Sequence, residues 1–134
     1  MNARKLSLEK ATVEQVILLA HALNEKADTI FPPTEGPTKF SPDEEAKLAE
    51  LEASPEYTAM KQFLAELRPQ EMRELQALMY LGRGDFEVSR FWEDCSALRM
   101  HKDSAVEASH VMSKGRLIDY LSNGFEKLNR GRLV

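Results

Sequence analysis

The sequence predicts an all-α fold, a compact bundle of six to seven short helices whose neighbours are mostly antiparallel. Apolar residues recur at three- and four-residue spacing through most of the chain, and no segment alternates apolar and polar residues as a half-buried strand does. Pro, Ser and Gly residues divide the periodic segments into short pieces. The connections between most of these pieces are short, which favours antiparallel neighbours.

Composition indicates one domain spanning residues 1–134, with 43% apolar residues, 30% charged residues and a formal net charge of −4. A chain of this length buries roughly two thirds of its unfolded surface, so it needs no disulfide or metal to fold. The negative charge argues against broad binding to nucleic-acid phosphates. The single cysteine, Cys95, favours a reducing compartment. The longest apolar run, residues 16–20, is far below the ~20 residues of a membrane helix. We therefore expect a cytoplasmic protein with no membrane contact.

The N-terminal part is predicted to form one helix followed by a long loop. Apolar residues at helical spacing indicate a helix over residues 13 to about 27. Thr12 and Gln15 have the form of a capping box at its start. Residues 28–40 are then crowded with helix breakers, which predicts a long loop. These breakers are Pro32, Pro33, Gly36 and Pro37.

Two Ser-Pro pairs, at Ser41 and at Ser54, indicate two further helix starts. In each pair the serine is a good N-cap and the proline suits the first helical position. The first helix should end before Pro55 and the second before Pro69, because proline disfavours a helical conformation in the residue before it. The first of the two has few apolar residues, so we expect it to lie at the periphery.

The central element is predicted to be a helix over residues 69–81. Its last turn is apolar nearly all round, which indicates burial on several sides. Gly82 is expected to form a left-handed C-terminal cap and Gly84 to allow a sharp reversal. Asp85 is then expected to be the N-cap of the next helix.

Three more helices are predicted after this turn, over residues 86–101, 104–114 and 116–128. The first of them has an apolar stripe that includes Cys95, so this thiol is interpreted as core filler. Ser104 and Glu107 have the form of another capping box.

Glu107 and His110 are the candidate metal ligands, because an Glu-x-x-His pair on a helix occurs in di-iron carboxylate bundles. Such sites need two of these pairs and two more acids, and no other Glu in the chain has a His three residues later. A capping acid beside a half-buried histidine is the favoured interpretation. We expect no metal or other cofactor, and a metal-dependent enzyme that uses Glu107 and His110 remains the first alternative function.

A helix-turn-helix that binds nucleic acid is the second alternative. Two predicted helices meet at residues 82–85, and the second helix includes Arg90 and Arg99. The same helix also has three acidic residues that would face phosphates, namely Glu87, Glu93 and Asp94. The sequence therefore argues against nucleic acid as a partner.

Two segments, Leu78-Met-Tyr-Leu-Gly-Arg-Gly-Asp-Phe86 and Leu117-Ile-Asp-Tyr-Leu-x-x-Gly-Phe125, resemble a small bacterial family described only as a domain of unknown function. The resemblance covers roughly residues 65–128. Tyr80 stands where the family pattern has Trp, and Gly115 where it has Pro. The resemblance implies a bacterial intracellular origin, and it implies no activity, cofactor or catalytic residue.

The sequence thus favours a small non-enzymatic helical interaction or regulatory module over an enzyme. Large apolar residues are numerous for a bundle of such short helices, which suggests a homo-oligomer or a protein partner. The residues proposed for a functional surface are Arg83, Asp85, Asp119 and Tyr120, because they belong to the two distinctive segments and are polar or aromatic.

Overall fold

The computed structural model describes residues 6–30, 42–100, 102–114 and 116–132. Within these ranges the chain forms seven α-helices, one short 3-10 helix and no strand, which confirms the all-α prediction. The helices are α1 (Lys10–Ile30), α2 (Pro42–Glu52), α3 (Pro55–Ala65), α4 (Pro69–Arg83), η1 (Val88–Arg90), α5 (Phe91–Ala97), α6 (Ser104–Met112) and α7 (Leu117–Arg132).

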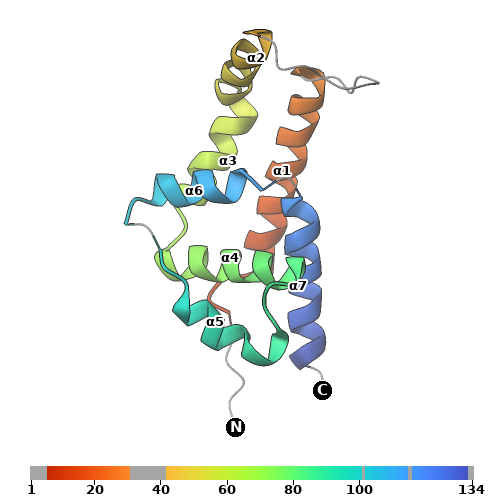
Figure 1. The fold of residues 1–134 in the computed structure, drawn as a ribbon, viewed down its shortest axis with the longest axis vertical. Coiled ribbons are helices and arrows are strands. Elements are labelled where there is room, and N and C mark those ends of the chain that lie inside the picture. The colour runs from red at the N-terminus through yellow and green to blue at the C-terminus, as the bar shows by residue number, and fades with distance from the viewer. Residues whose placement is uncertain (1–5, 31–41, 101, 115, 133–134) are drawn as a thin grey trace.

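α4 lies across α7, with α5 on one side of α4 and α6 on the other (Figure 1). On the other side of the molecule α1 and α3 run side by side in opposite directions, and α6 lies across α3 next to α4. The far end of α1 and the whole of α2 project beyond the other helices. Of the described side chains of α2, none belongs to the buried core, which agrees with its predicted peripheral place.

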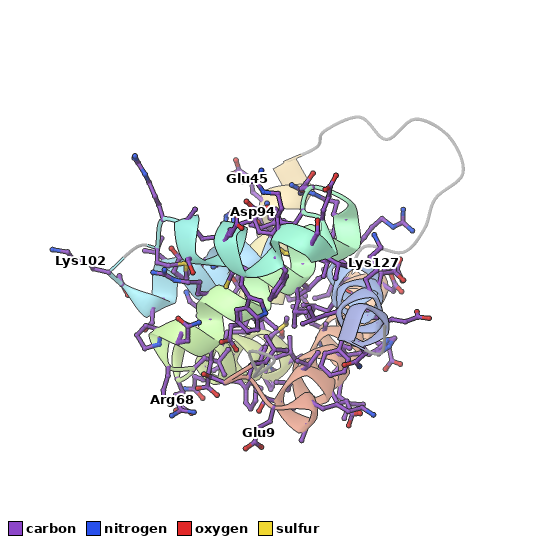
Figure 2. All side chains as sticks on the ribbon, turned by 90° about the horizontal axis from the view of Figure 1, so that it is seen from below. Glu9, Glu45, Arg68, Asp94, Lys102 and Lys127 are labelled. Carbon is purple, nitrogen blue, oxygen red and sulfur yellow. The ribbon has the colours of Figure 1, made fainter. Side chains whose placement is uncertain are left out.

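The apolar core is one cluster that reaches from Leu8 to Leu128 and includes residues of every α-helix except α2. The charged side chains labelled in Figure 2 lie at the periphery. α4 is the most buried element, as its sequence predicts. Its buried residues are Met72, Glu74, Leu75, Gln76, Ala77, Leu78, Met79 and Leu81.

Two glycines bring α4 and α7 into backbone contact. A Cβ atom on Gly82 would overlap the carbonyl oxygen of Tyr120 and lie 2.8 Å from the backbone nitrogen of Gly124. A Cβ atom on Gly124 would overlap the carbonyl oxygen of Leu78. Lys127 of α7 adds a hydrogen bond, since its Nζ donates to the carbonyl oxygen of Leu81 at 3.1 Å. Gly82 is therefore a packing residue within α4, and its prediction as a C-terminal cap is wrong.

The cap of α4 is Gly84, whose φ of 97° lies in the left-handed region that favours glycine. Its backbone N–H donates to the carbonyl oxygens of Tyr80 and Leu81. The sharp reversal predicted at this glycine is confirmed.

α1 is longer than predicted at both ends. It begins at Lys10, so Thr12 lies within the helix and the predicted capping box is wrong. It continues to Ile30, which makes residues 28–30 helical although they were assigned to the loop. The rest of that predicted loop, residues 31–40, and the cap at Ser41 lie outside the described residues.

The single helix predicted over residues 86–101 is wrong, because η1 and the short α5 stand in its place. Asp85 is not an N-cap: Glu87 precedes η1, and Asp85 pairs with Arg83. α5 ends at Ala97, and Leu98 has the extended backbone dihedrals φ −62° and ψ 129°. Leu98 and Met100 then line the same cavity, which two residues at this spacing on a helix would not do.

The predicted starts of α3 and α4 are confirmed. Ser54 caps α3, since its Oγ accepts a hydrogen bond from the backbone N–H of Tyr57 at 3.2 Å. At the start of α4, Oε1 of Glu71 accepts hydrogen bonds from the backbone N–H of Arg68 at 2.9 Å and from its Nε at 3.1 Å. The backbone hydrogen bond, followed by the side-chain one, lowers the pKa of Glu71.

We predict that Glu71→Gln lowers the free energy of unfolding by about 0.5–1 kcal/mol at pH 7, because the capping carboxylate loses its charge. The pKa of Glu71 is lowered in the folded state, so its contribution is present above the unfolded value of about 4.3 and is lost as pH falls through the folded value. Urea unfolding between pH 7 and about 2.5 measures the difference, because the folded pKa lies below the unfolded one. Glu66→Gln, at an exposed position, is the control, and a difference independent of pH would contradict this cap.

Among the described residues, none of the helices combines the length and the apolar character that crossing a bilayer requires.

Candidate functional site

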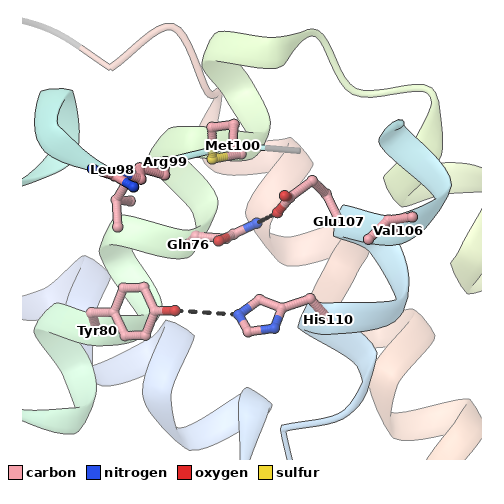
Figure 3. A pocket seen from close by; sticks show the side chains of 8 residues that line it. All are labelled: Gln76, Tyr80, Leu98, Arg99, Met100, Val106, Glu107 and His110. Carbon is pink, nitrogen blue, oxygen red and sulfur yellow. Dashed lines mark hydrogen bonds between the residues drawn. The ribbon is translucent and has the colours of Figure 1, made fainter. Parts of the chain in front are cut away.

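A pocket of about 530 Å³ lies between α4, α6 and the extended segment that follows α5 (Figure 3). Its walls combine polar groups from the two helices with apolar groups from the segment and from α6. The residues that line it are Gln76, Tyr80, Leu98, Arg99, Met100, Val106, Glu107 and His110. We call it the α4–α6 pocket.

Helical spacing places the polar lining residues in register. Gln76 and Tyr80 are four residues apart on α4, and Glu107 and His110 are three apart on α6, so each pair shares a helix face. The sequence suggested that Glu107 caps α6, but it does not. Asp103 is the N-cap, and its Oδ1 accepts a hydrogen bond from the backbone N–H of Ala105 at 2.9 Å. Glu107 instead lies on the buried side of the helix, where it is 8% exposed.

The floor of the pocket is a hydrogen bond between two buried polar side chains. Nε2 of Gln76 donates to Oε2 of Glu107 at 2.5 Å, and the two residues are only 3% and 8% exposed. An ionised carboxylate can only accept, so the amide nitrogen must face Glu107 and the amide oxygen of Gln76 must face away from it. Figure 3 shows this orientation. A short hydrogen bond to a charged group, away from water, fixes both side chains.

A second polar contact lies nearer the mouth. Oη of Tyr80 is 3.3 Å from Nε2 of His110, and the tautomer of the imidazole decides which group donates. His110 is exposed, whereas Tyr80 is half-buried. The two contacts thus join α4 to α6, one at the buried floor of the pocket and one near its exposed mouth (Figure 3).

The metal candidates Glu107 and His110 are therefore brought into one pocket. A structural zinc site takes four protein ligands, and a catalytic one takes three. In the part of the chain that the structure describes, no group of three His, Cys, Asp or Glu side chains is placed to hold a metal ion. The Glu107 carboxylate is instead engaged by the amide of Gln76.

Three of the four residues proposed for a functional surface converge beside this pocket. Nε of Arg83 donates to Oδ2 of Asp85 at 2.6 Å. The Arg83 guanidinium also lies 5.3 Å from the ring centroid of Tyr80 and 6.0 Å from that of Tyr120, within reach of a cation–π interaction. Asp119 does not join them, because it pairs at 3.2 Å with Arg116, the residue just before α7. Arg83 thus has a structural role that the sequence did not reveal.

Tyr80 connects this surface cluster to the pocket. Its hydroxyl faces His110 in the pocket, and its ring lies near the Arg83 guanidinium and 5.3 Å from the ring of Phe86.

The turn after α4 offers little to a nucleic-acid backbone. The helix that follows, α5, has seven residues, and Arg90 is paired with Glu93 at 3.4 Å. A recognition helix needs basic residues that are free to face phosphates.

The sequence interpretation missed Gln76 and Tyr80 as site residues. The signal for Gln76 was present: a polar amide between apolar residues of a helix that is expected to be buried must find a hydrogen-bonding partner. No local signal marked the wall formed by Leu98 and Met100, because it depends on the early end of α5.

Comparison with known protein families gives a match over more than half of the chain. A family model, described as "Protein of unknown function (DUF3775)", matches residues 57–130. The match contains every residue of the α4–α6 pocket and both glycines of the α4–α7 contact, and it leaves α1 and α2 outside. Neither the curated proteins nor the solved structures gave a match. Since the matched region is more than half of the chain, the protein belongs to the DUF3775 family.

Proposed function

We propose that the protein is a non-enzymatic helical binding module and that the α4–α6 pocket is its binding site. The observation that carries the proposal is a buried polar pair, Gln76 and Glu107, at the floor of an open pocket of about 530 Å³. Small-molecule sites have this size and combine apolar walls with a few fixed polar groups. The floor is held by its own hydrogen bond, so the polar groups are in place before a ligand arrives.

The chemistry of the lining favours binding over catalysis. The carboxylate of Glu107 faces an amide, which cannot exchange a proton with it at ordinary pH. The lining residues include no Ser, Thr, Cys or Lys that could serve as a nucleophile. The pair of Tyr80 and His110 lies toward the mouth, with His110 in contact with water. Binding therefore accounts for the arrangement without an added reaction.

The proposal also includes a bacterial, cytoplasmic setting and a homo-oligomeric or other protein partner. The single cysteine supports a reducing compartment. Cys95 is buried in α5, which is the usual state of a structural thiol. Exposed apolar side chains outside the pocket, such as Leu18 and Leu48, support contact with a partner.

We test the site by closing its mouth. Val106 lines the pocket and is 45% exposed, so Val106→Trp fills the mouth without entering the core. Leu18→Trp adds the same ring at a position on α1 that is 62% exposed and outside the pocket. ¹⁵N-labelled protein is titrated with cationic, anionic and neutral aromatic fragments, and amide shifts are recorded.

Wild-type protein and Leu18→Trp are expected to show shifts at residues 76–80 and 106–110, and Val106→Trp is expected to lose them. Two results would contradict the proposal. The first is that no fragment perturbs these amides at millimolar concentration. The second is that Val106→Trp binds as the wild type does.

A further inference from the structure

We infer that the outer face of α1 binds a second copy of this chain, and that the two α1 helices then run antiparallel about a twofold axis at Leu18. The inference rests on the proposed function, since it names the surface that the proposed homo-oligomer uses. Two features carry it: an exposed stripe of residues along α1, and the order of the charges beside that stripe.

α1 has two stripes of residues, on opposite sides of the helix. One is buried in the core, where α1 packs against α3 and α7, and it includes Val13, Val16 and Ala20. The other is exposed and repeats at alternating spacings of four and three residues, as the seam of a coiled coil does. Its residues are Ala11, Gln15, Leu18, Ala22, Glu25 and Thr29. We call it the outer stripe of α1.

Leu18 lies at the centre of the outer stripe. Its side chain is 62% exposed, the highest value among the large apolar side chains that the structure describes. Ala22, one turn further along, is exposed as well and is small enough to let a second helix approach. An isolated leucine on a surface is common, but this one occupies a seam position. A second α1 helix laid along the stripe would bury Leu18 against the same residue of the other copy.

The charges beside the outer stripe match those of a second copy in the antiparallel direction. Lys10 and Glu25 lie on the same side of the helix, because fifteen residues are about four turns. Lys10 lies about 12 Å before Leu18 along the axis, and Glu25 about 10 Å after it. A twofold axis at Leu18 therefore brings Lys10 of each copy beside Glu25 of the other. A parallel pair would instead place like charges together, and the helix dipoles would also oppose it.

Both charged groups can reach a second copy. On its own helix Lys10 pairs with Glu14 at 3.8 Å, and the two side chains are 72% and 60% exposed, so this pair is weak. An ammonium has three donors, and a single carboxylate at that distance leaves donors for another one. Glu25 is exposed, and the ion pairs in the described part of the chain are made by other acids.

The interface is small, so we expect a reversible dimer. α1 has 21 residues and is about 30 Å long. One face of such a helix buries less than the roughly 1,200 Å² at which stable interfaces begin. The dissociation constant is expected to be on the order of 100 µM, measured by sedimentation equilibrium of the full chain from about 10 µM to about 1 mM.

Substitutions at the axis test the face. Leu18→Arg places two like charges opposite each other on the twofold axis, so it should weaken association at least tenfold. Leu48→Arg makes the same change at an exposed residue of α2, 49% exposed, and should associate as the wild type does. Both positions are exposed, so neither arginine enters the core.

Charge reversal tests the direction of the two helices. Lys10→Glu and Glu25→Lys should each weaken the dimer about tenfold, because like charges then meet at both ends of the contact. The variant that carries both changes restores opposite charges at each end, and its dissociation constant should return to within about threefold of the wild type.

The outcomes separate this interface from the rest of the proposed function. A chain that is monomeric at about 1 mM overturns the interface and the proposed homo-oligomer together. A dimer that persists in Leu18→Arg, that dissociates in Leu48→Arg, or that the double reversal fails to restore overturns this interface and leaves the homo-oligomer standing. The α4–α6 pocket is decided separately by the fragment titration, because no residue of α1 lines it. For the same reason Leu18→Trp remains a valid control there.

Discussion

Gly124→Ala is expected to destabilise the protein by about 3 kcal/mol or more, the upper end of the range for overpacking. The added Cβ would overlap the carbonyl oxygen of Leu78 and lie 3.2 Å from the backbone nitrogen of Gly82. These are backbone atoms, which cannot rotate away as a side chain can, so α4 and α7 must separate. For a chain of this length the loss corresponds to roughly 10 °C in Tm, measured by thermal and urea unfolding.

The sign of the change in stability shows whether the two helix backbones are in contact. In an ordinary helix interior, Gly→Ala stabilises by roughly 0.5–1 kcal/mol because it reduces the entropy of the unfolded chain. A stabilised Gly124→Ala variant would therefore show that the two backbones are not in contact. Gly84→Asn is the control, since its position is open and asparagine tolerates the left-handed backbone.

A double mutant identifies the two glycines as one contact. Gly82→Ala alone should cost about as much as Gly124→Ala, because its Cβ would overlap the Tyr120 carbonyl oxygen. Once the helices have separated for one methyl group, the second costs less. The combined loss should then fall short of the sum of the two, by more than the roughly 0.5 kcal/mol seen for independent sites. A strictly additive result would contradict the shared contact.

The glycine contact also shows which features of the fold could not be predicted from the sequence. The starts of α3 and α4 could be predicted because a serine cap and a proline at the first turn act on neighbouring backbone groups. A glycine near the end of a helix has two interpretations, a left-handed cap or a close approach of another backbone. Only the position of α7, more than thirty residues further along the chain, assigns Gly84 to the first and Gly82 to the second.

The pocket could be predicted only in part, because the sequence shows which residues share a helix and not which helices face each other. Glu107 and His110 were recognisable as a pair because their spacing is local to one helix. Their partners Gln76 and Tyr80 lie some thirty residues earlier, and nothing in the sequence states that α4 faces α6. The cap of α6 is Asp103 and not Ser104, so Glu107 does not occupy the capping-box position. Its burial depends on the elements that pack against α6, which the sequence does not show.

Glu74→Ala is expected to cost about 2–3 kcal/mol, because a buried carboxylate holds the N-terminal segment on α4. Glu74 is 1% exposed, and its Oε1 accepts a hydrogen bond from the backbone N–H of Leu8 at 2.9 Å. Its Oε2 accepts from Nε2 of Gln70, also at 2.9 Å. Removal of the carboxylate leaves a buried backbone donor without its acceptor, and that group bears the full desolvation penalty.

Glu74→Gln separates the hydrogen bond from the charge. The amide oxygen still accepts from Leu8, so we expect this variant to lose less than half of what Glu74→Ala loses in urea unfolding. Hydrogen exchange gives the local measurement: the Leu8 amide should lose protection in Glu74→Ala and retain most of it in Glu74→Gln. Equal losses in the two variants, or a Leu8 amide that is unaffected by both, would contradict the role of this carboxylate.

The Glu74 variants also test how the N-terminal segment around Leu8 is attached to the rest of the protein. Leu8 precedes the region matched by the family model, whereas Glu74 lies within it. Leu8 is itself 2% exposed and belongs to the core cluster, so the hydrogen bond fixes an apolar residue as well as a backbone amide. If Glu74→Ala exposes the Leu8 amide while amides in α7 follow only global unfolding, the N-terminal segment opens as a local unit. The hydrogen bond to Glu74 then joins that segment to the region that the family model matches.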